Sequence, residues 1–119
     1  MKQRQPMVSI TYRELLNQEL KSRIQNDPLY SLRAMARQIK ISPAMLSAIL
    51  NGKRNLSVEK ACDISKALLF TERQSDYFVL LVLYANVSLP KSKEDLRKKL
   101  LLLEMNDDVL NASERKARR

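Results

Sequence analysis

Basic residues at helical spacing in the first half of the chain have the chemistry needed to hold phosphates. Arg33 and Arg37 are four residues apart, with Lys40 one turn further along, so on a helix they share one face and form a basic ridge. A guanidinium group can donate two parallel hydrogen bonds to one phosphate. The spacing therefore predicts phosphate contacts by Arg33 and Arg37, and the alternative is a solvated charged surface.

The net charge favours a polyanionic partner. The chain of 119 residues has 22 Lys and Arg against 13 Asp and Glu, a formal net charge of +9. Such an excess suits nucleic acid first and an anionic membrane surface second, and the alternative is a merely soluble, well-charged surface. No apolar run approaches the length of a membrane span, and residues 1–10 lack the apolar core of a secretory signal. We therefore expect no membrane partner and a cytoplasmic, nucleoid-associated protein.

Residue types needed for metal or nucleophilic chemistry are scarce. The sequence has no histidine and one cysteine, Cys62, so a zinc site or a histidine-based nucleophilic centre has no ligands to use. Cys62 lies in an apolar run, which favours a small core residue over a redox sensor. The sequence also has no glycine-rich phosphate loop. We expect no metal, no cofactor, no small-molecule ligand and no enzymatic activity.

The basic ridge belongs to the first of two short helices joined by a tight turn. The first helix is predicted from Ser31 to about Lys40, with apolar residues on one face. Ser42 then stands as an N-cap and Pro43 as the first residue of the second helix. That helix ends at Asn51-Gly52, where glycine can take the left-handed conformation that closes a helix. Two short helices joined in this way make a helix-turn-helix.

Composition and further helix-start signals predict an all-α fold. One glycine and four prolines leave few turns for a multi-stranded sheet. Capping boxes begin at Thr11 and Thr71, and Ser57 caps the helix between them. We predict a compact bundle of five or so helices that contains the helix-turn-helix, plus a C-terminal helix that begins near Ser92.

The chain divides into three predicted segments. Residues 1–9 are polar and basic and are expected to form a flexible arm. Residues 10–86 form the helix-turn-helix domain. After a linker, residues 91–119 form the C-terminal helix and a basic tail.

Two of the predicted helices are more apolar than a single buried face requires. Residues 78–83 are apolar nearly all round, and four consecutive leucines occupy residues 100–103, so each helix needs cover on more than one side. A homodimer interface is the economical explanation, and docking of the C-terminal helix onto the preceding helix is the alternative. The residues predicted for the interface are Leu81, Leu96, Leu100 and Leu103.

The motifs around the two short helices resemble those of known helix-turn-helix proteins. The pattern ARQIKIS…LSAILNGKRNLS is similar to the Cro and lambda-repressor type. A closer similarity, over about residues 10–85, is to a poorly characterised bacterial family with the motifs YR-x-L-L, YSLRAFAR, LS-x-x-x-LS-x-x-L-x-GKRNLS and EREYF-x-x-LV. This chain resembles those motifs at residues 12–16, 30–37, 42–57 and 71–82. Many members of that family continue into a larger C-terminal domain, which we do not expect here.

The resemblance implies which residues of the second helix face DNA bases. Those expected at base edges in the major groove are Pro43, Ala44, Ser47 and Ala48, with Asn51 also outward at the end of the helix. None of the first four is an Arg, Lys, Gln or Asn, the residues that make paired hydrogen bonds to guanine or adenine. We therefore expect weak direct readout, with specificity carried largely by close fit and DNA shape.

The resemblance also implies a role for the loop that follows. In Cro-like proteins a loop at this position resembles a clamp in which exposed amides and basic side chains meet phosphates, which points to Lys53 and Arg54. We predict sequence-specific or shape-reading binding of double-stranded DNA by a homodimeric transcriptional regulator. The alternative is a protein-interaction module, adaptor or antitoxin-like, that reuses the fold. Salt distinguishes the two, because phosphate contacts weaken steeply as salt rises.

Overall fold

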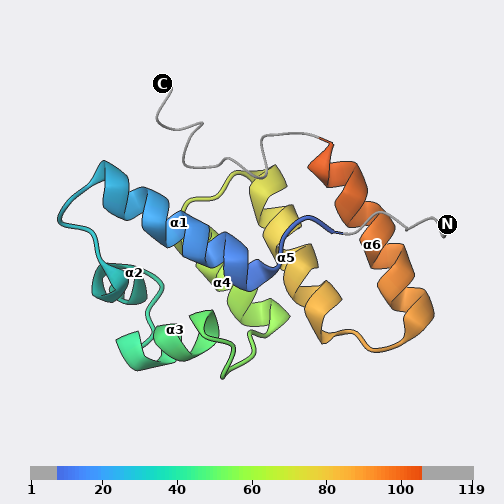
Figure 1. The fold of residues 1–119 in the computed structure, drawn as a ribbon, viewed down its shortest axis with the longest axis horizontal. Helices are drawn as coiled ribbons and strands as arrows, with labels where there is room; N and C mark the ends of the chain where they lie inside the picture. Colours follow the sequence, from blue (N-terminus) through green and yellow to red (C-terminus); the bar gives the residue numbers. More distant parts are fainter. Residues whose placement is uncertain (1–7, 106–119) are drawn as a thin grey trace, which may run out of the picture.

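The computed structural model describes residues 8–105, which form six helices and no strand (Figure 1). They are α1 (Tyr12–Asn26), α2 (Leu32–Gln38), α3 (Pro43–Leu50), α4 (Val58–Ala67), α5 (Glu72–Asn86) and α6 (Pro90–Glu104). The all-α prediction is confirmed. Most of the predicted basic arm and all of the basic tail lie outside the described residues. Within residues 8–105, no helix has the length and apolar character required to cross a bilayer.

Five of the six helices begin at the residue that the sequence predicts. Thr11 and Thr71 each form a full capping box. The threonine side chain accepts from the backbone N–H three residues on, and the side chain of that residue accepts from the backbone N–H of the threonine. Ser31, Ser42 and Ser57 each accept one such hydrogen bond, at 3.0 to 3.1 Å. Because a cap satisfies backbone groups that would otherwise lack a partner, these starts are set by local sequence.

Helices α2, α3 and α4 all end in the same left-handed turn. The residues with positive φ are Lys40 (62°), Gly52 (83°) and Leu69 (62°). In each turn, the N–H of this residue and the N–H of the next residue bond back to carbonyls in the last helical turn, at 2.9 to 3.3 Å. This is the Schellman arrangement. Only the turn at Gly52 was predicted from the sequence.

The last helix begins earlier than predicted. It starts at Pro90 rather than near Ser92, and its N-cap Leu89 makes no side-chain hydrogen bond. Proline suits the first position of a helix because its missing N–H would have no helical partner there. The linker after α5 is therefore only residues 87–89.

The hydrophobic core is centred on α5, which contacts α1, α4 and α6 (Figure 1). Tyr77, Phe78 and Val82 of α5 are fully buried. Three of the four leucines predicted for a dimer interface also lie inside the protomer: Leu81, Leu96 and Leu100 are between 0% and 9% exposed. Leu103 is half-buried against the same core. Docking of α6 onto α5 thus covers these side chains, so their apolar character no longer requires a second subunit.

A hydrogen-bonded cluster fixes the end of α6. The Glu104 carboxylate accepts from the Ser9 N–H at 3.1 Å, from the Ser9 hydroxyl at 2.9 Å and from the Tyr77 hydroxyl at 2.6 Å. It thereby ties α6 to α5 and to the segment before α1. Burial and the neighbouring Glu104 carboxylate raise the pKa of Tyr77 well above its usual range, because both disfavour the phenolate.

Candidate nucleic-acid interface

The angle between α2 and α3 is set by a small shared core and a strained turn. Met35 and Ala36 of α2 and Leu46 and Ile49 of α3 are all 0% to 3% exposed, and the two helices are in contact. Lys40 takes the left-handed conformation between them. Since alanine has the smallest side chain that still suits a helix, Ala36 allows the close approach that the turn imposes.

One hydrogen bond links α2 to α4, and a second one orients the Gln38 side chain that makes it. The Gln38 side-chain amide donates to the Ala67 carbonyl at 3.1 Å, and the Tyr30 hydroxyl donates to the Gln38 side-chain oxygen at 2.7 Å. Partial burial raises the pKa of Tyr30 above its usual value, because it disfavours the phenolate. The helix pair therefore has a fixed position relative to the rest of the domain.

The outward side of α3 presents the small residues that the resemblance implied. Ala44 and Asn51 are exposed, and Pro43, Ser47 and Ala48 are half-buried. The Asn51 side-chain amide donates to the Ser47 hydroxyl at 3.3 Å. Ser47 and Asn51 are thus a hydrogen-bonded polar pair beside the apolar side chains of Pro43, Ala44 and Ala48.

The loop after α3 differs from the predicted clamp in one respect. The backbone N–H groups of Lys53 and Arg54 both donate to the Ala48 carbonyl, at 2.9 and 3.1 Å, and the Gly52 N–H donates to the Ile49 carbonyl at 3.3 Å. These three amides complete the helix end and so are not the exposed amides of such a clamp, while phosphate binding by Lys53 and Arg54 stays a prediction. The Lys53 and Arg54 side chains remain exposed.

Arg13 of α1 holds this loop in place, a role that was not predicted from the sequence. Its Nη1 donates to the carbonyls of Ile49 and Arg54, at 2.5 and 2.9 Å, and its Nη2 donates to the Asn55 side-chain oxygen at 2.8 Å. Its guanidinium also lies 4.8 Å from the centre of the Tyr12 ring. One side chain from the first helix therefore caps α3 and fixes the conformation of the basic loop.

Two more side chains fix the far end of the loop. The Leu56 N–H donates to the Tyr12 hydroxyl at 3.2 Å, and the Asn86 side-chain amide donates to the Leu56 carbonyl at 3.0 Å. Leu56 itself is 2% exposed and anchors the loop in the core. The adjacent Tyr12 and Arg13 form the YR pair of the motif that opens the resemblance, so the motif contained a signal for this role.

Charged residues within the segment that forms the helix pair are of one sign. Residues 28–58 contain five Lys and Arg and no Asp or Glu. Arg33, Arg37, Lys53 and Arg54 are exposed, and none of them forms an ion pair with another described residue. The basic side chains of α2 and of the loop therefore leave their charge available to an anion from outside the chain.

Comparison with known proteins agrees with this geometry. Residues 29–71 match a helix-turn-helix family model, of the type found in Cro and C1 repressors. This segment is a helix-turn-helix. The match includes α2, α3 and α4 whole, and domains of this type bind DNA in transcriptional regulators rather than catalyse reactions. No curated protein and no solved structure matches the chain.

Proposed function

We propose that this chain binds double-stranded DNA as a transcriptional regulator, with α3 in the major groove. The observation that carries the proposal is the segment of residues 28–58, which has five basic residues and no acidic one and contains the helix-turn-helix. Arg33 and Arg37 contact phosphates on one side of α3, and Lys53 and Arg54 contact phosphates on the other. Phosphate contacts of this kind set the position of the protein on the duplex.

Base recognition rests on few polar atoms. On the outward side of α3, the coupled pair Ser47 and Asn51 supplies the hydrogen-bonding groups, while Ala44 and Ala48 offer methyl groups suited to a thymine methyl. Asn51 retains one amide hydrogen and its carbonyl oxygen, enough for one pair of bonds to adenine. DNA shape contributes the remaining specificity.

A homodimer would place two copies of α3 on successive major grooves. The half-sites would then lie one helical turn apart, about 34 Å, in a pseudo-palindromic operator. Sedimentation of the protein on a duplex from its own upstream region tests this arrangement. A single copy bound per duplex at saturating protein would contradict it.

The phosphate contacts are tested by binding in a salt series. Fluorescence anisotropy is measured with labelled duplex from the upstream region and from a random pool, for the wild type and for Lys53→Ala/Arg54→Ala. We expect the slope of log K against log salt to become shallower by about two in the variant, one for each phosphate that the loop no longer neutralises.

A matched control separates this effect from net charge. Lys91→Ala/Lys98→Ala removes two exposed cations from α6, and we expect its salt slope to equal that of the wild type. An unchanged slope in Lys53→Ala/Arg54→Ala would refute the assignment of the loop. Absence of binding to either duplex near physiological salt would refute DNA binding itself and favour the protein-interaction alternative.

A further inference from the structure

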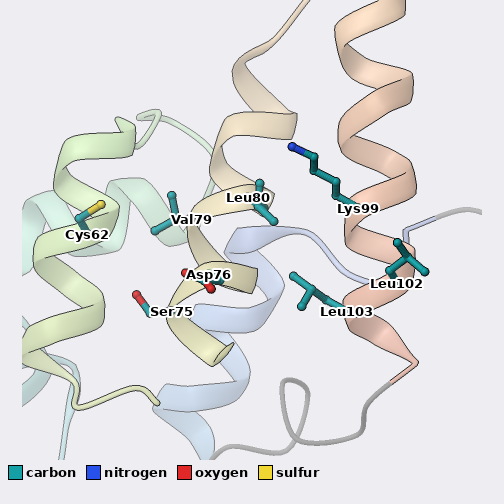
Figure 2. Close-up of a pocket in the computed structure, with 8 residues that line it drawn as sticks. All are labelled: Cys62, Ser75, Asp76, Val79, Leu80, Lys99, Leu102 and Leu103. Carbon is teal, nitrogen blue, oxygen red and sulfur yellow. The ribbon is translucent and has the colours of Figure 1, made fainter. Parts of the chain in front are cut away.

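An open apolar groove lies between α4, α5 and α6 (Figure 2). Its cavity volume is about 570 Å³. Its apolar walls are Val79 and Leu80 of α5 and Leu102 and Leu103 of α6, and Figure 2 shows the Leu103 side chain directed toward α5. We refer to this feature as the α5–α6 groove.

The groove is the side of α5 that no helix of residues 8–105 covers. α1, α4 and α6 contact the other sides of α5. Leu102 is 67% exposed, and Val79, Leu80 and Leu103 are half-buried. Apolar side chains from two neighbouring helices thus form a continuous exposed strip, which is typical of a surface that binds another protein.

The charges at the groove are balanced. Asp76 lies on the α5 wall and Lys99 on the α6 wall, and Figure 2 shows Lys99 extending toward α5. The groove is therefore formally neutral on a chain whose net charge is +9. Two copies of this chain repel each other over most of their surface, and repulsion is weakest where a neutral apolar patch meets its equal.

We propose that the α5–α6 groove binds the same groove of a second copy of this chain. In a two-fold interface, a contact of one residue with another in the partner copy occurs twice, with the roles exchanged. The proposed pairing places Asp76 of each copy opposite Lys99 of the other, where the charges attract. The two ion pairs fix the register, and the leucines of α6 fill the opposing groove. This inference rests on the proposed function, in which the chain binds DNA as a homodimer. It places the dimer interface on the accessible groove rather than on the leucines that are buried within the protomer.

The position of the groove is compatible with DNA binding. In Figure 1, α6 lies at one end of the molecule, and α2 and α3 lie at the other. Contact through the groove leaves α3 of both copies uncovered. Each copy can then place its own helix-turn-helix on a half-site.

The test uses charge reversal at the two groove residues in the full chain. Sedimentation velocity from micromolar to about 100 micromolar protein is measured for the wild type, Asp76→Lys, Lys99→Asp and the double variant. We expect a concentration-dependent dimer in the wild type, at least a tenfold weaker dimer in each single variant, and recovery in the double variant. Asp95→Lys, an exposed residue of α6 outside the groove, makes the same charge change and should leave the dimer intact.

Cys62 provides a second readout in the same samples. It is the chain's one cysteine and it lines the groove, half-buried. The rate at which a thiol reagent modifies the protein therefore reports whether this groove is covered. We expect its reaction rate to fall as wild-type protein concentration rises and to stay constant in Asp76→Lys. Circular dichroism of each variant confirms that the helices are retained.

Three results would overturn the proposal. A wild type that stays monomeric over the whole concentration range would show that a second copy does not bind the groove. Failure of the double variant to recover the dimer would refute the Asp76–Lys99 pairing. Protection of Cys62 that is independent of concentration and disappears when residues 106–119 are removed would identify that segment as the occupant. Binding of a single half-site duplex, measured on the same variants, tests the proposed function separately, since a monomer can bind it.

Discussion

Arg13 shows how one side chain can set the shape of an interface that it does not belong to. Its planar guanidinium has five N–H donors in a fixed arrangement, and it uses them on two carbonyls and one side-chain oxygen around the loop after α3. These acceptors lie 36 to 42 residues away in sequence. Arg13 is therefore a positioning residue for Lys53 and Arg54.

The first prediction concerns removal of this side chain. Arg13→Ala removes the side-chain donor to the Arg54 carbonyl and one of the donors to the Ile49 carbonyl, which keeps the Gly52 N–H, and we expect the free energy of unfolding to fall by about 2 kcal/mol. The loop should also lose its fixed conformation. DNA affinity should then fall while the salt slope stays that of the wild type, because Arg13 itself contacts no phosphate. Urea denaturation and anisotropy in a salt series measure the two effects.

Arg13→Lys and Lys21→Ala complete the comparison. Lysine retains the charge but lacks the planar fork, so Arg13→Lys should recover only part of the stability. Lys21 is exposed on the same helix and makes no hydrogen bond to a described residue, so its replacement should change neither quantity. A salt slope that becomes shallower still when Arg13→Ala is added to Lys53→Ala/Arg54→Ala would mean that Arg13 contacts DNA directly, because that background already lacks the phosphate contacts of the loop.

What the sequence could and could not predict differs even among neighbouring atoms. The exposure of Arg33 and Arg37 follows from helical spacing, because the apolar residues between them determine which face is buried. The use of the Lys53 and Arg54 amides does not follow, since it depends on the three-dimensional path of the helix end. The base-facing role of the outward side of α3 stays a prediction, and the hydrogen bond between Asn51 and Ser47 on that side was not foreseen.

At the level of helices, five of the six starts were predictable, whereas of the three left-handed ends only the one at Gly52 was predicted. A start is encoded by one polar side chain that bonds three residues ahead, as at Ser42 and Ser57. The left-handed ends at Lys40 and Leu69 occur in residues that disfavour this conformation. They are imposed by packing of the following segment, which no local pattern reveals. The burial of Leu81, Leu96 and Leu100 within the protomer was not predicted for a similar reason. An excess of apolar residues in a helix does not indicate whether the same chain or a second copy covers them.

The second prediction is that removal of the backbone strain at one left-handed residue stabilises the domain. Leu69 is 70% exposed, so Leu69→Gly removes little buried surface. The left-handed conformation costs a residue with a Cβ about 1 to 2 kcal/mol, and the greater freedom of glycine in the unfolded chain costs about 0.4 to 1 kcal/mol. We expect a net gain of about 0.5 to 1 kcal/mol in the free energy of unfolding, measured by urea denaturation. Leu69→Ala retains the strain and should show no gain.

The third prediction is the reverse change at the end of α3. A Cβ added at Gly52 would lie 3.9 Å from Arg13 Nε, an ordinary contact, so Gly52→Ala introduces backbone strain without a steric clash. We expect a loss of about 1 kcal/mol in the free energy of unfolding, measured by urea denaturation. A loss several times larger would show that the Arg13 contacts, rather than the φ of 83°, determine the effect.

Across the whole molecule, the position of α6 depends on a polar cluster of Ser9, Tyr77 and Glu104. Apolar burial of Leu96 and Leu100 supplies adhesion between α6 and α5, but apolar contact is not directional. The carboxylate of Glu104 adds direction, because it accepts from an N–H and two hydroxyls of different segments. The α5–α6 groove exists only while α6 keeps this position.

The last prediction tests that cluster through pH. Tyr77→Phe removes the hydroxyl donor to Glu104, and we expect the free energy of unfolding at pH 7 to fall by about 2 kcal/mol. The folded-state pKa of Tyr77 is raised above the unfolded value of 10.0, so its stabilising effect is complete below pH 10 and is lost as pH rises above it. At pH 11 the difference between wild type and variant should shrink by about 1.4 kcal/mol, since the unfolded chain gains a phenolate that the folded chain cannot hold. Urea denaturation of both proteins at the two pH values measures this change. An equal difference at pH 7 and pH 11 would mean that the Tyr77 hydroxyl is not buried against Glu104, and α6 would then be held by apolar contact alone.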